Sequence, residues 1–296
     1  MKIAVIILNY NGIDDTIDCL KSIRTLEKDG NNLEIIVVDN NSSDGSQEVL
    51  SKLKDIHLIK NSSNLGYSGG NNVGIKYVLK KNSDFILILN NDTVVDKRLL
   101  MNLVEAAKSA DIISPKIYFS KGYEFRKSWY RGYDLGKVIW YAGGNIDWVN
   151  IIGKHIGVDE VDKNQYDKPR ETDFATGACM FVKSEVLKKI GLFDEKYFLY
   201  LEDMDFCTRA QKAGFKIIYE PRAIIFHKNA QSVQGSGSEL QDYFITRNRL
   251  LFALKFARLR TKLAVFKQVA TQLNNPIKRR AFLDFITGRF GKGTYI

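Results

Sequence analysis

Two aspartates follow short apolar runs of the kind that form buried strands, and each could bind a nucleotide or a metal. Asp39 comes after residues 34–38, and its carboxylate could accept hydrogen bonds from a nucleobase imide or a ribose hydroxyl. Asp92 follows residues 85–89 and offers the oxygen ligand that Mg²⁺ or Mn²⁺ requires beside phosphates. The alternative for both is a turn aspartate that caps the next helix.

The densest acidic cluster is Glu202-Asp203-Met204-Asp205, directly after the aromatic run 197–200. A carboxylate beside apolar walls has a raised pKa, which suits a general base. Asp203 is the preferred base, and Glu202 is its rival. Taken alone, the cluster is more typical of an acidic first helical turn, where carboxylates interact favourably with the helix dipole.

A glycine-rich stretch, residues 64–74, lacks both the dinucleotide fingerprint and the P-loop lysine. It leads into a predicted helix over 70–81, whose free N–H groups would suit phosphate, although a simple glycine turn is the alternative. His227 ends an apolar run, and a lone histidine is more often structural than a ligand. Arg247 could clamp a diphosphate, or it could be one surface charge among many.

These residues need elements that bring them together, and the apolar pattern predicts an alternation of strand and helix. Strands are predicted at 3–8, 34–38, 56–60 and 85–89, and helices at 14–25, 46–53, 70–81 and 99–108. This order predicts an α/β fold with a mostly parallel sheet and helices on both faces. Ligands bind such sheets at the carboxyl ends of the strands, so the polar clusters should meet along one edge, namely 9–12, 39–42, 64–74 and 90–93.

The second half of the sequence is less regular. Residues 118–170 are rich in aromatics and glycine, which predicts loops and short antiparallel strands that set the acceptor. Regular patterns return as strands at 179–182, 216–219 and 223–226 and helices at 184–189 and 202–213. We expect one domain over 1–242, with a nucleotide-sugar half to about 115 and an acceptor-binding, catalytic half over 116–242.

The last segment, residues 243–296, carries twelve Lys or Arg against one acid, while the preceding residues are close to neutral. Its mixture of apolar and basic residues predicts one long helix or two, suited to the surface of an anionic membrane. It shows no base-stacking or groove-reading features, so no nucleic-acid partner is expected. The alternative is that part of it packs on the domain while the charges face solvent.

The bulk composition fits a protein of the cytoplasm. No apolar run approaches the roughly 18 residues of a membrane span, and the first one is too short for a signal peptide. The three cysteines are odd in number and widely spaced, which predicts neither disulfides nor a cysteine metal cluster. We therefore expect a cytoplasmic protein held peripherally at the inner face of the cell membrane.

Together these motifs resemble glycosyltransferase family 2, a family with the GT-A fold, and especially its rhamnosyltransferase-like bacterial members. The resemblance covers residues 2–248 and depends on the order of segments that are individually weak. In chain order these segments are 5–11, 37–42, 64–74, 89–92, 176–179, 191–195, 200–209, 226–227 and 247–248.

The resemblance implies a site residue by residue. It assigns the metal, Mg²⁺ or Mn²⁺, to Asp92 and His227, and the catalytic base to Asp203. Asn90 stands where the family's metal motif has its first aspartate. The acceptor side would include Gly177, Ala178 and Asp205. The donor, including its diphosphate, would be bound by Asn9, Tyr10, Asn11, Asp39, Asn41, Asn64, Gly69, Gly70, Asn71, Asn90, Asn91 and Arg247.

The implied reaction is an inverting, metal-dependent transfer of a sugar from a UDP- or dTDP-sugar, with rhamnose among the candidates. The acceptor would be a saccharide or a polyprenyl-linked saccharide in cell-surface polysaccharide synthesis. One alternative is a nucleotidyltransferase, which would show an early basic glycine loop where this chain has residues 9–12. Another is a non-catalytic nucleotide-sugar-binding subunit of a membrane assembly, although Asp92, Asp203 and His227 are all intact.

Overall fold

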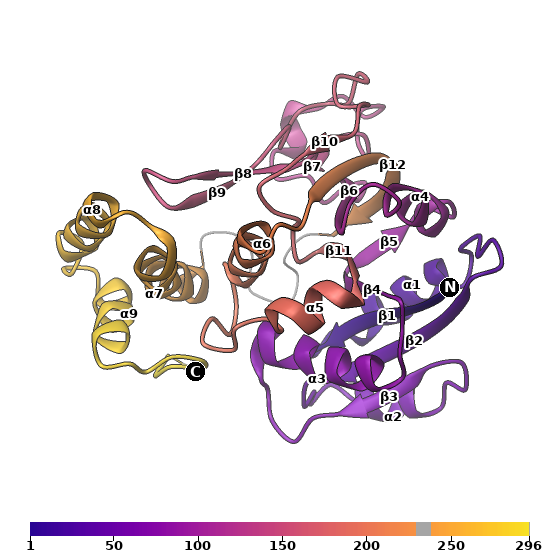
Figure 1. Cartoon of the computed structure of the whole chain (residues 1–296), viewed down its shortest axis with the longest axis horizontal. Helices are drawn as coiled ribbons and strands as arrows, with labels where there is room; N and C mark the ends of the chain where they lie inside the picture. The colour runs from indigo at the N-terminus through magenta and orange to yellow at the C-terminus, as the bar shows by residue number, and fades with distance from the viewer. Residues whose placement is uncertain (229–237, 296) are drawn as a thin grey trace.

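A computed structural model describes residues 1–228 and 238–295 of the chain. Its first half is the predicted alternation, with the strands β1 (Lys2–Asn9), β2 (Asn32–Asp39), β3 (His57–Lys60) and β4 (Phe85–Asn90). β1 lies between β2 and β4 and is parallel to both, and β3 extends the sheet beyond β2 (Figure 1). The apolar runs of β1 and β4 are buried because helices cover both faces of the sheet.

The helices of the first half are α1 (Ile13–Ile23), α2 (Ser46–Ser51), α3 (Gly66–Lys80) and α4 (Leu99–Ala106). α3 starts four residues earlier than the glycine pattern predicts. Three of its glycines face other chain segments closely, and a Cβ on Gly70 would lie 2.4 Å from Leu8 Cδ1. The glycines therefore let α3 approach the sheet, and they extend the helix instead of forming the turn before it.

The second half completes the sheet with strands of both directions. Its main strands are β6 (Ile112–Phe119), β11 (Cys179–Lys183) and β12 (Ile217–His227), so the path runs β10-β12-β6-β11-β4-β1-β2-β3. β11 is antiparallel to both β4 and β6. β12 is one strand where the sequence predicts two, and its pairing shifts between Glu220 and Ile224, around Pro221, which has no N–H to donate.

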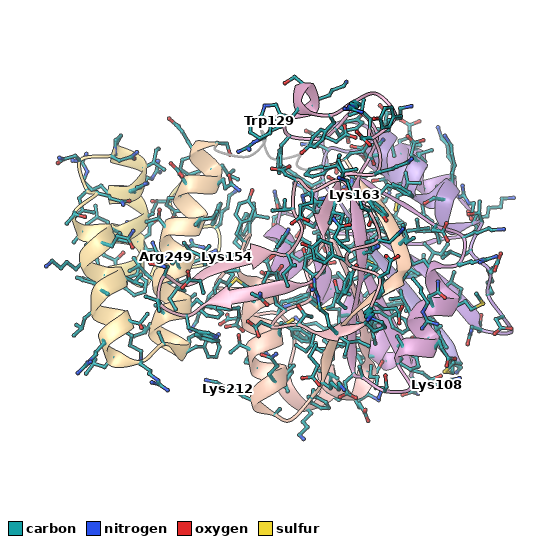
Figure 2. The ribbon with its side chains drawn as sticks, turned by 90° about the horizontal axis from the view of Figure 1, so that it is seen from above. Lys108, Trp129, Lys154, Lys163, Lys212 and Arg249 are labelled. Atoms are coloured by element: carbon teal, nitrogen blue, oxygen red, sulfur yellow. The ribbon has the colours of Figure 1, made fainter. Side chains whose placement is uncertain are left out.

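Smaller elements complete this half. They are β5 (Thr93–Val95), the 3₁₀ turn Lys127–Trp129, β7 (Ile139–Tyr141), β8 (Gly144–Asp147), β9 (Ile152–His155), β10 (Arg170–Glu171), α5 (Ser184–Ile190) and α6 (Glu202–Lys212). β8 and β9 form the kind of antiparallel pair expected in 118–170. The tip of this hairpin reaches α7, where Arg249 Nε donates to Asn150 O at 2.7 Å (Figure 2).

The C-terminal segment forms three helices, α7 (Glu239–Phe256), α8 (Leu259–Ala270) and α9 (Pro276–Ile286). They lie together beyond one end of the large sheet (Figure 1). α7 begins at Glu239, before the boundary predicted at residue 243, and Ser238 caps it. Its buried face includes Leu250, Leu251 and Phe252. Among the described residues, none of the helices is long and apolar enough to cross a membrane.

Candidate active site

The carboxyl ends of β1 and β2 form one hydrogen-bonded edge. Asn9 Nδ2 donates to Asp39 Oδ2 at 2.8 Å, and both side chains are fully buried. The other Asp39 oxygen accepts from Ser42 N at 3.0 Å and from Gln47 Nε2 at 2.7 Å. Asp39 therefore organises this edge, and its direct contact with a nucleobase stays a prediction. The neighbouring side chains of Tyr10, Asn11 and Asn41 are exposed at the same edge.

The end of β4 joins this edge through Asn91. Its Nδ2 donates to Thr16 Oγ1 at 3.0 Å, and the Thr16 hydroxyl donates to Asn9 Oδ1 at 2.8 Å. On the other side of β4, Asn90 N donates to Ala178 O at 3.0 Å, which ties the edge to the turn before β11. The predicted polar clusters of β1, β2 and β4 are thus brought together as expected for a sheet of this kind.

Asp92 and His227 form a buried pair beside β4. His227 ends β12, which is antiparallel to β5, so that His227 lies opposite Thr93. His227 Nε2 is 3.0 Å from Asp92 Oδ1, and the two residues are 4% and 6% exposed. Neither atom completes a hydrogen bond with good geometry in the described part of the chain.

A divalent cation could bind Asp92 Oδ1 and His227 Nε2, which have no other partner among the described residues. Buried polar atoms without partners are rare, and a carboxylate oxygen beside an imidazole nitrogen is a donor set that suits Mn²⁺ better than Mg²⁺, which prefers oxygen ligands. Within the described ranges no group of three or more His, Cys, Asp or Glu side chains could hold a metal. Such an ion would therefore need further oxygens from a bound diphosphate or from water, as hard cations at phosphate sites usually do.

The acidic cluster begins α6, next to the turn 176–178. Asp203 Oδ2 accepts from Gly177 N at 3.0 Å and Oδ1 accepts from Met204 N at 2.8 Å. Burial raises the pKa of Asp203 above the usual aspartate range, although these two N–H groups oppose the shift. Glu202 is more deeply buried, its Oε2 has no partner, and burial together with the neighbouring Asp203 charge raises its pKa further.

The turn at Gly177 links the acidic cluster to the edge of the sheet. Tyr67 from α3 donates its hydroxyl to Gly177 O at 2.5 Å. A Cβ at Gly177 would lie 2.7 Å from that hydroxyl oxygen, so the close approach requires glycine. Asn90 N donates to Ala178 O, and the adjacent Gly177 N donates to Asp203 Oδ2. The base candidate therefore lies beside the end of β4.

Comparison with known proteins identifies the chain. A family model described as Glycosyl transferase family 2 matches residues 4–191. The chain belongs to this family. Among its relatives, the low-salt glycan biosynthesis hexosyltransferase Agl10 of Haloferax volcanii is 29% identical over 252 residues, which cover 84% of this chain and 74% of the relative. The N-acetylglucosaminyl-diphospho-decaprenol L-rhamnosyltransferase of Mycobacterium tuberculosis is 24% identical over 68% of each chain.

The fold of this glycosyltransferase is GT-A, as predicted. The crystal structure of GalNAc-T7 with UDP, GalNAc and Mn²⁺ superposes with a TM-score of 0.63 at 14% identity. The match covers 97% of the present chain but spans only 56% of that enzyme's chain. The family match and the named relatives confirm that the protein is a glycosyltransferase of a rhamnosyltransferase-like group.

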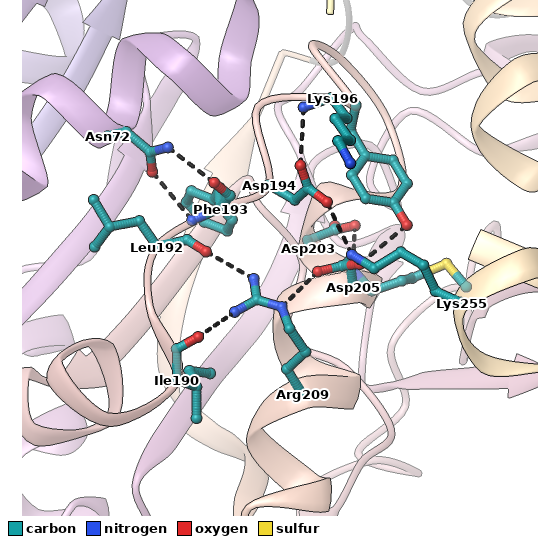
Figure 3. A network of polar contacts seen from close by, with 12 residues as sticks. Asn72, Ile190, Leu192, Phe193, Asp194, Lys196, Asp203, Asp205, Arg209 and Lys255 are labelled. Carbon is teal, nitrogen blue, oxygen red and sulfur yellow. Dashed lines mark hydrogen bonds and ion pairs between the residues drawn. The ribbon is translucent and has the colours of Figure 1, made fainter. Parts of the chain in front are cut away.

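The prediction that Asp205 lies on the acceptor side is wrong, because its carboxylate is fully buried in an ionic network (Figure 3). Arg209 Nε donates to Asp205 Oδ1 at 2.6 Å, and Lys255 and the Tyr197 hydroxyl contact Oδ2. Lys255 also bonds Asp194 at 2.9 Å. Asp205 thus joins α6 to α7 and is not available to a substrate.

The prediction that Arg247 clamps the donor diphosphate is also wrong for the structure described. Its side chain is fully buried, and its guanidinium donates to backbone carbonyls of Lys196, Tyr197 and Gly291 and to Asn248 Oδ1. With these donors engaged, the guanidinium has no exposed face for a phosphate.

The N-terminus of α3 is likewise unavailable to phosphate. Gly66 N donates to Asn64 Oδ1 at 2.8 Å, and the N–H groups of Tyr67 and Ser68 donate to Phe198 O at 2.7 and 3.2 Å. Gly69 and Gly70 lie inside the helix and serve its close packing. Asn71 is buried there, and its Oδ1 and Ser68 Oγ have no protein partner among the described residues.

The pattern of residue types did not single out Tyr67, Thr16 or Asn248 as functional. Tyr67 and Asn248 lie within the matched segments 64–74 and 247–248, so the signal for them is their position beside other motif residues. A hollow of about 800 Å³ lies elsewhere, on the irregular segment, and shares no residue with the strand-end site; it is lined by Arg131, Tyr133, Asp134, Glu160, Val161, Lys163 and Gln165.

Proposed function

We propose that this glycosyltransferase is an inverting, metal-dependent enzyme in which Asp203 is the general base. The observation that carries the proposal is the fixed Asp203 carboxylate. Gly177 N binds this carboxylate in the turn that adjoins the strand-end edge. Asp92 and His227, whose facing atoms complete no hydrogen bond, lie beside β4 at the same edge. A single displacement at a nucleotide-sugar needs a base and a cation site at the same edge of the sheet, because proton removal and departure of the diphosphate occur together.

In the proposed reaction, the acceptor hydroxyl oxygen forms a bond to the anomeric carbon of the donor. Its proton passes to an Asp203 oxygen, while the bond between the anomeric carbon and the diphosphate oxygen breaks. The nucleoside diphosphate leaves with that electron pair, and the anomeric configuration inverts. A divalent cation bound by Asp92 and His227 would supply positive charge to the departing diphosphate.

Asp203 is a better base than Glu202 because of its surroundings. Asp203 accepts two backbone N–H bonds that favour its ionised form, and it is partly exposed. Glu202 is buried, has an oxygen without a partner and faces the charge of Asp203, so it remains protonated when Asp203 is ionised. The raised pKa of Asp203 makes it more basic than an ordinary aspartate.

The donor would lie along the edge formed by β1, β2 and β4, with exposed Tyr10, Asn11 and Asn41 around the nucleoside and Asn90, Asn91 and Asn71 nearer the sugar. The relatives' names include dTDP-rhamnosyl transferase RfbF and an L-rhamnosyltransferase acting on a diphospho-decaprenol. We propose accordingly a UDP- or dTDP-sugar donor and a saccharide or polyprenyl-linked saccharide acceptor in surface-polysaccharide synthesis.

A direct test combines a donor panel with product stereochemistry. Purified protein would be incubated with UDP-, dTDP- and GDP-sugars with Mn²⁺, Mg²⁺ or EDTA, and release of nucleoside diphosphate would be followed. We expect one UDP- or dTDP-sugar to be used, only with metal, and the product's anomeric signal in NMR to be inverted relative to the donor. Retention of configuration, or full activity in EDTA, would refute the mechanism.

The helices α8 and α9 suggest where the enzyme meets a membrane. On α8, Leu259, Leu263 and Phe266 follow helical spacing and are 71%, 63% and 43% exposed. Phe266 contacts Phe282 of α9 with ring centroids 5.1 Å apart, and this continues the apolar strip toward exposed Leu283 and Ile286.

The charges around this strip are all of one sign. Asp284, the one acid after residue 242, is buried and bonded to Tyr243 and Thr294, whereas many Lys and Arg side chains of α8 and α9 are exposed. An exposed apolar strip among cations fits an anionic lipid surface, and we propose that the enzyme is cytoplasmic and peripheral there.

Vesicle co-sedimentation tests this docking. We expect binding to vesicles containing phosphatidylglycerol, weak binding to phosphatidylcholine alone, and loss of binding for Leu263→Glu. Val149→Glu, at a residue of the β8–β9 hairpin that is 74% exposed, is the matched control and should still bind. Binding that ignores lipid charge, or that both substitutions reduce alike, would contradict the proposal.

A further inference from the structure

The loop that precedes the proposed base has an unusual backbone. Phe198, Tyr200 and Leu201 have φ of 64°, 69° and 68°, a left-handed conformation that non-glycine residues rarely adopt. Three such residues within four positions persist only where neighbouring groups hold them in place. The loop leads directly into Glu202 and Asp203, so whatever holds it also sets the direction from which the base approaches the acceptor.

α7 holds this loop through Asn248. The Nδ2 atom of Asn248 lies 2.9, 2.7 and 2.9 Å from the carbonyl oxygens of Tyr197, Leu199 and Tyr200. The Asn248 side chain is fully buried, so its amide is shielded from solvent. A carboxamide has only two N–H bonds, and three acceptors around them leave the amide fully engaged by the loop.

Arg247 fixes the orientation of that amide. Its Nε and Nη2 atoms both lie 3.0 Å from Asn248 Oδ1, so the amide oxygen faces the guanidinium and the NH₂ group faces the loop. Nη2 also donates to Tyr197 O at 3.0 Å, and Nη1 donates to Gly291 O at 2.8 Å. The two side chains therefore act as one hydrogen-bonded unit between the C-terminal helices and the loop.

The same loop also holds α3. Phe198 O accepts from the N–H groups of Tyr67 and Ser68, and a Cβ on Gly66 would lie 2.5 Å from the Phe198 ring. Tyr67 in turn contacts Gly177, whose N–H orients Asp203. Movement of the loop would therefore displace the base from both sides, through α6 and through Tyr67.

We propose that Asn248, oriented by Arg247, is a positioning residue for catalysis, which holds the left-handed loop and through it Asp203. The proposal rests on the proposed function of Asp203 as the base. Neither side chain touches substrate in this arrangement; each acts through backbone carbonyls. α7 then belongs to the catalytic unit, although the charge pattern of the sequence divides the chain at residue 243.

Steady-state kinetics of Asn248→Ala in the full chain test this role, with the donor and Mn²⁺ that support turnover. We expect kcat to fall about 100-fold, the size of effect that a misplaced catalytic group produces, while the KM for donor stays within about threefold. The acid limb of the kcat–pH profile should move to higher pH, because Asp203 loses the Gly177 N–H that favours its ionised form.

Phe252→Leu is the matched control, since it trims a buried side chain of α7 that packs on Trp148 and Phe256 and not on the loop. It should lower Tm but leave kcat and the pH profile unchanged. If Asn248→Ala does not fold, Arg247→Lys is the second variant. It keeps the charge but loses the two N–H groups that bond Asn248 Oδ1, and it should give a smaller kcat loss and the same pH shift.

The proposal is overturned if the folded Asn248→Ala enzyme keeps kcat within about threefold, or if both α7 variants lose kcat in proportion to Tm. Asp203→Asn, assayed in parallel, separates this failure from that of the proposed function. If Asp203→Asn is active, the assignment of Asp203 as the base is wrong. If Asp203→Asn is inactive while Asn248→Ala is active, only the positioning role is wrong.

Discussion

Glu202→Gln replaces a buried carboxyl by an amide of the same shape, and its effect on stability depends on pH. The folded-state pKa of Glu202 is raised, first by burial and then by Asp203, so folding favours the protonated form. That preference contributes stability fully below the unfolded pKa of about 4.3 and is lost as pH rises toward the folded pKa. The wild-type enzyme therefore carries a cost at neutral pH that glutamine does not.

The direction of the shift gives the sign of the effect on stability. Each pKa unit corresponds to about 1.4 kcal/mol, so a gain on the order of 1 kcal/mol at pH 8 relative to pH 4 is the scale that the assay must resolve. For a chain of this size that is a Tm increase of about 2–4 °C. If Asp203 is the base and Glu202 stays protonated, as proposed, kcat should stay within about threefold of wild type.

Differential scanning fluorimetry at pH 4 and pH 8, together with the transfer assay, measures both quantities. Glu185→Gln, at an exposed glutamate of α5, is the matched control and should show no pH-dependent gain in Tm. A Tm that falls equally at both pH values, or a kcat loss as deep as that of Asp203→Asn, would refute the reasoning and favour Glu202 as the base.

Four other substitutions probe three separate parts of the structure. Asp92→Asn and His227→Ala should each lower kcat/KM about 10–100-fold and weaken Mn²⁺ activation in a metal titration; an unchanged Mn²⁺ dependence would exclude them as ligands. Asp205→Ala removes the buried carboxylate that Arg209 and Lys255 contact and should cost about 1–3 kcal/mol in denaturant unfolding, because hydrogen bonds to a charged group are lost. Gly70→Ala should cost about 1–3 kcal/mol, since its Cβ would lie 2.4 Å from Leu8 Cδ1, and an unchanged midpoint would contradict that contact.

The sequence was sufficient for the parts of the fold that depend on local pattern. β1, β2 and β4 are continuous apolar runs bounded by polar residues, and the strand-end rule then brings Asn9, Asp39 and Asn91 together. β6 was not predicted because Ser114, Pro115 and Lys116 interrupt its apolar run. Its identity as a strand comes from pairing with β11 and β12, which are distant in the sequence.

Residue type alone could not distinguish a ligand-binding charge from one that binds the protein itself. Arg247 and Asp205 have the chemistry expected for a diphosphate clamp and an acceptor contact, yet the fold encloses both among its own polar groups. Burial of this kind depends on how α6, α7 and the C-terminal segment pack, and no periodicity in the sequence reports it. The same applies to Asn248, whose role comes from the carbonyls around it.

The central claim is that Asp203 removes the proton of the acceptor hydroxyl. The most direct measurement compares turnover and nucleotide affinity of Asp203→Asn with wild type, using calorimetric binding of the donor's nucleoside diphosphate in the presence of Mn²⁺. The account predicts a loss of turnover by a factor of 100 or more with affinity within about threefold, as for removal of a general base. Turnover near the wild-type rate, or an equal loss of turnover and affinity, would contradict it.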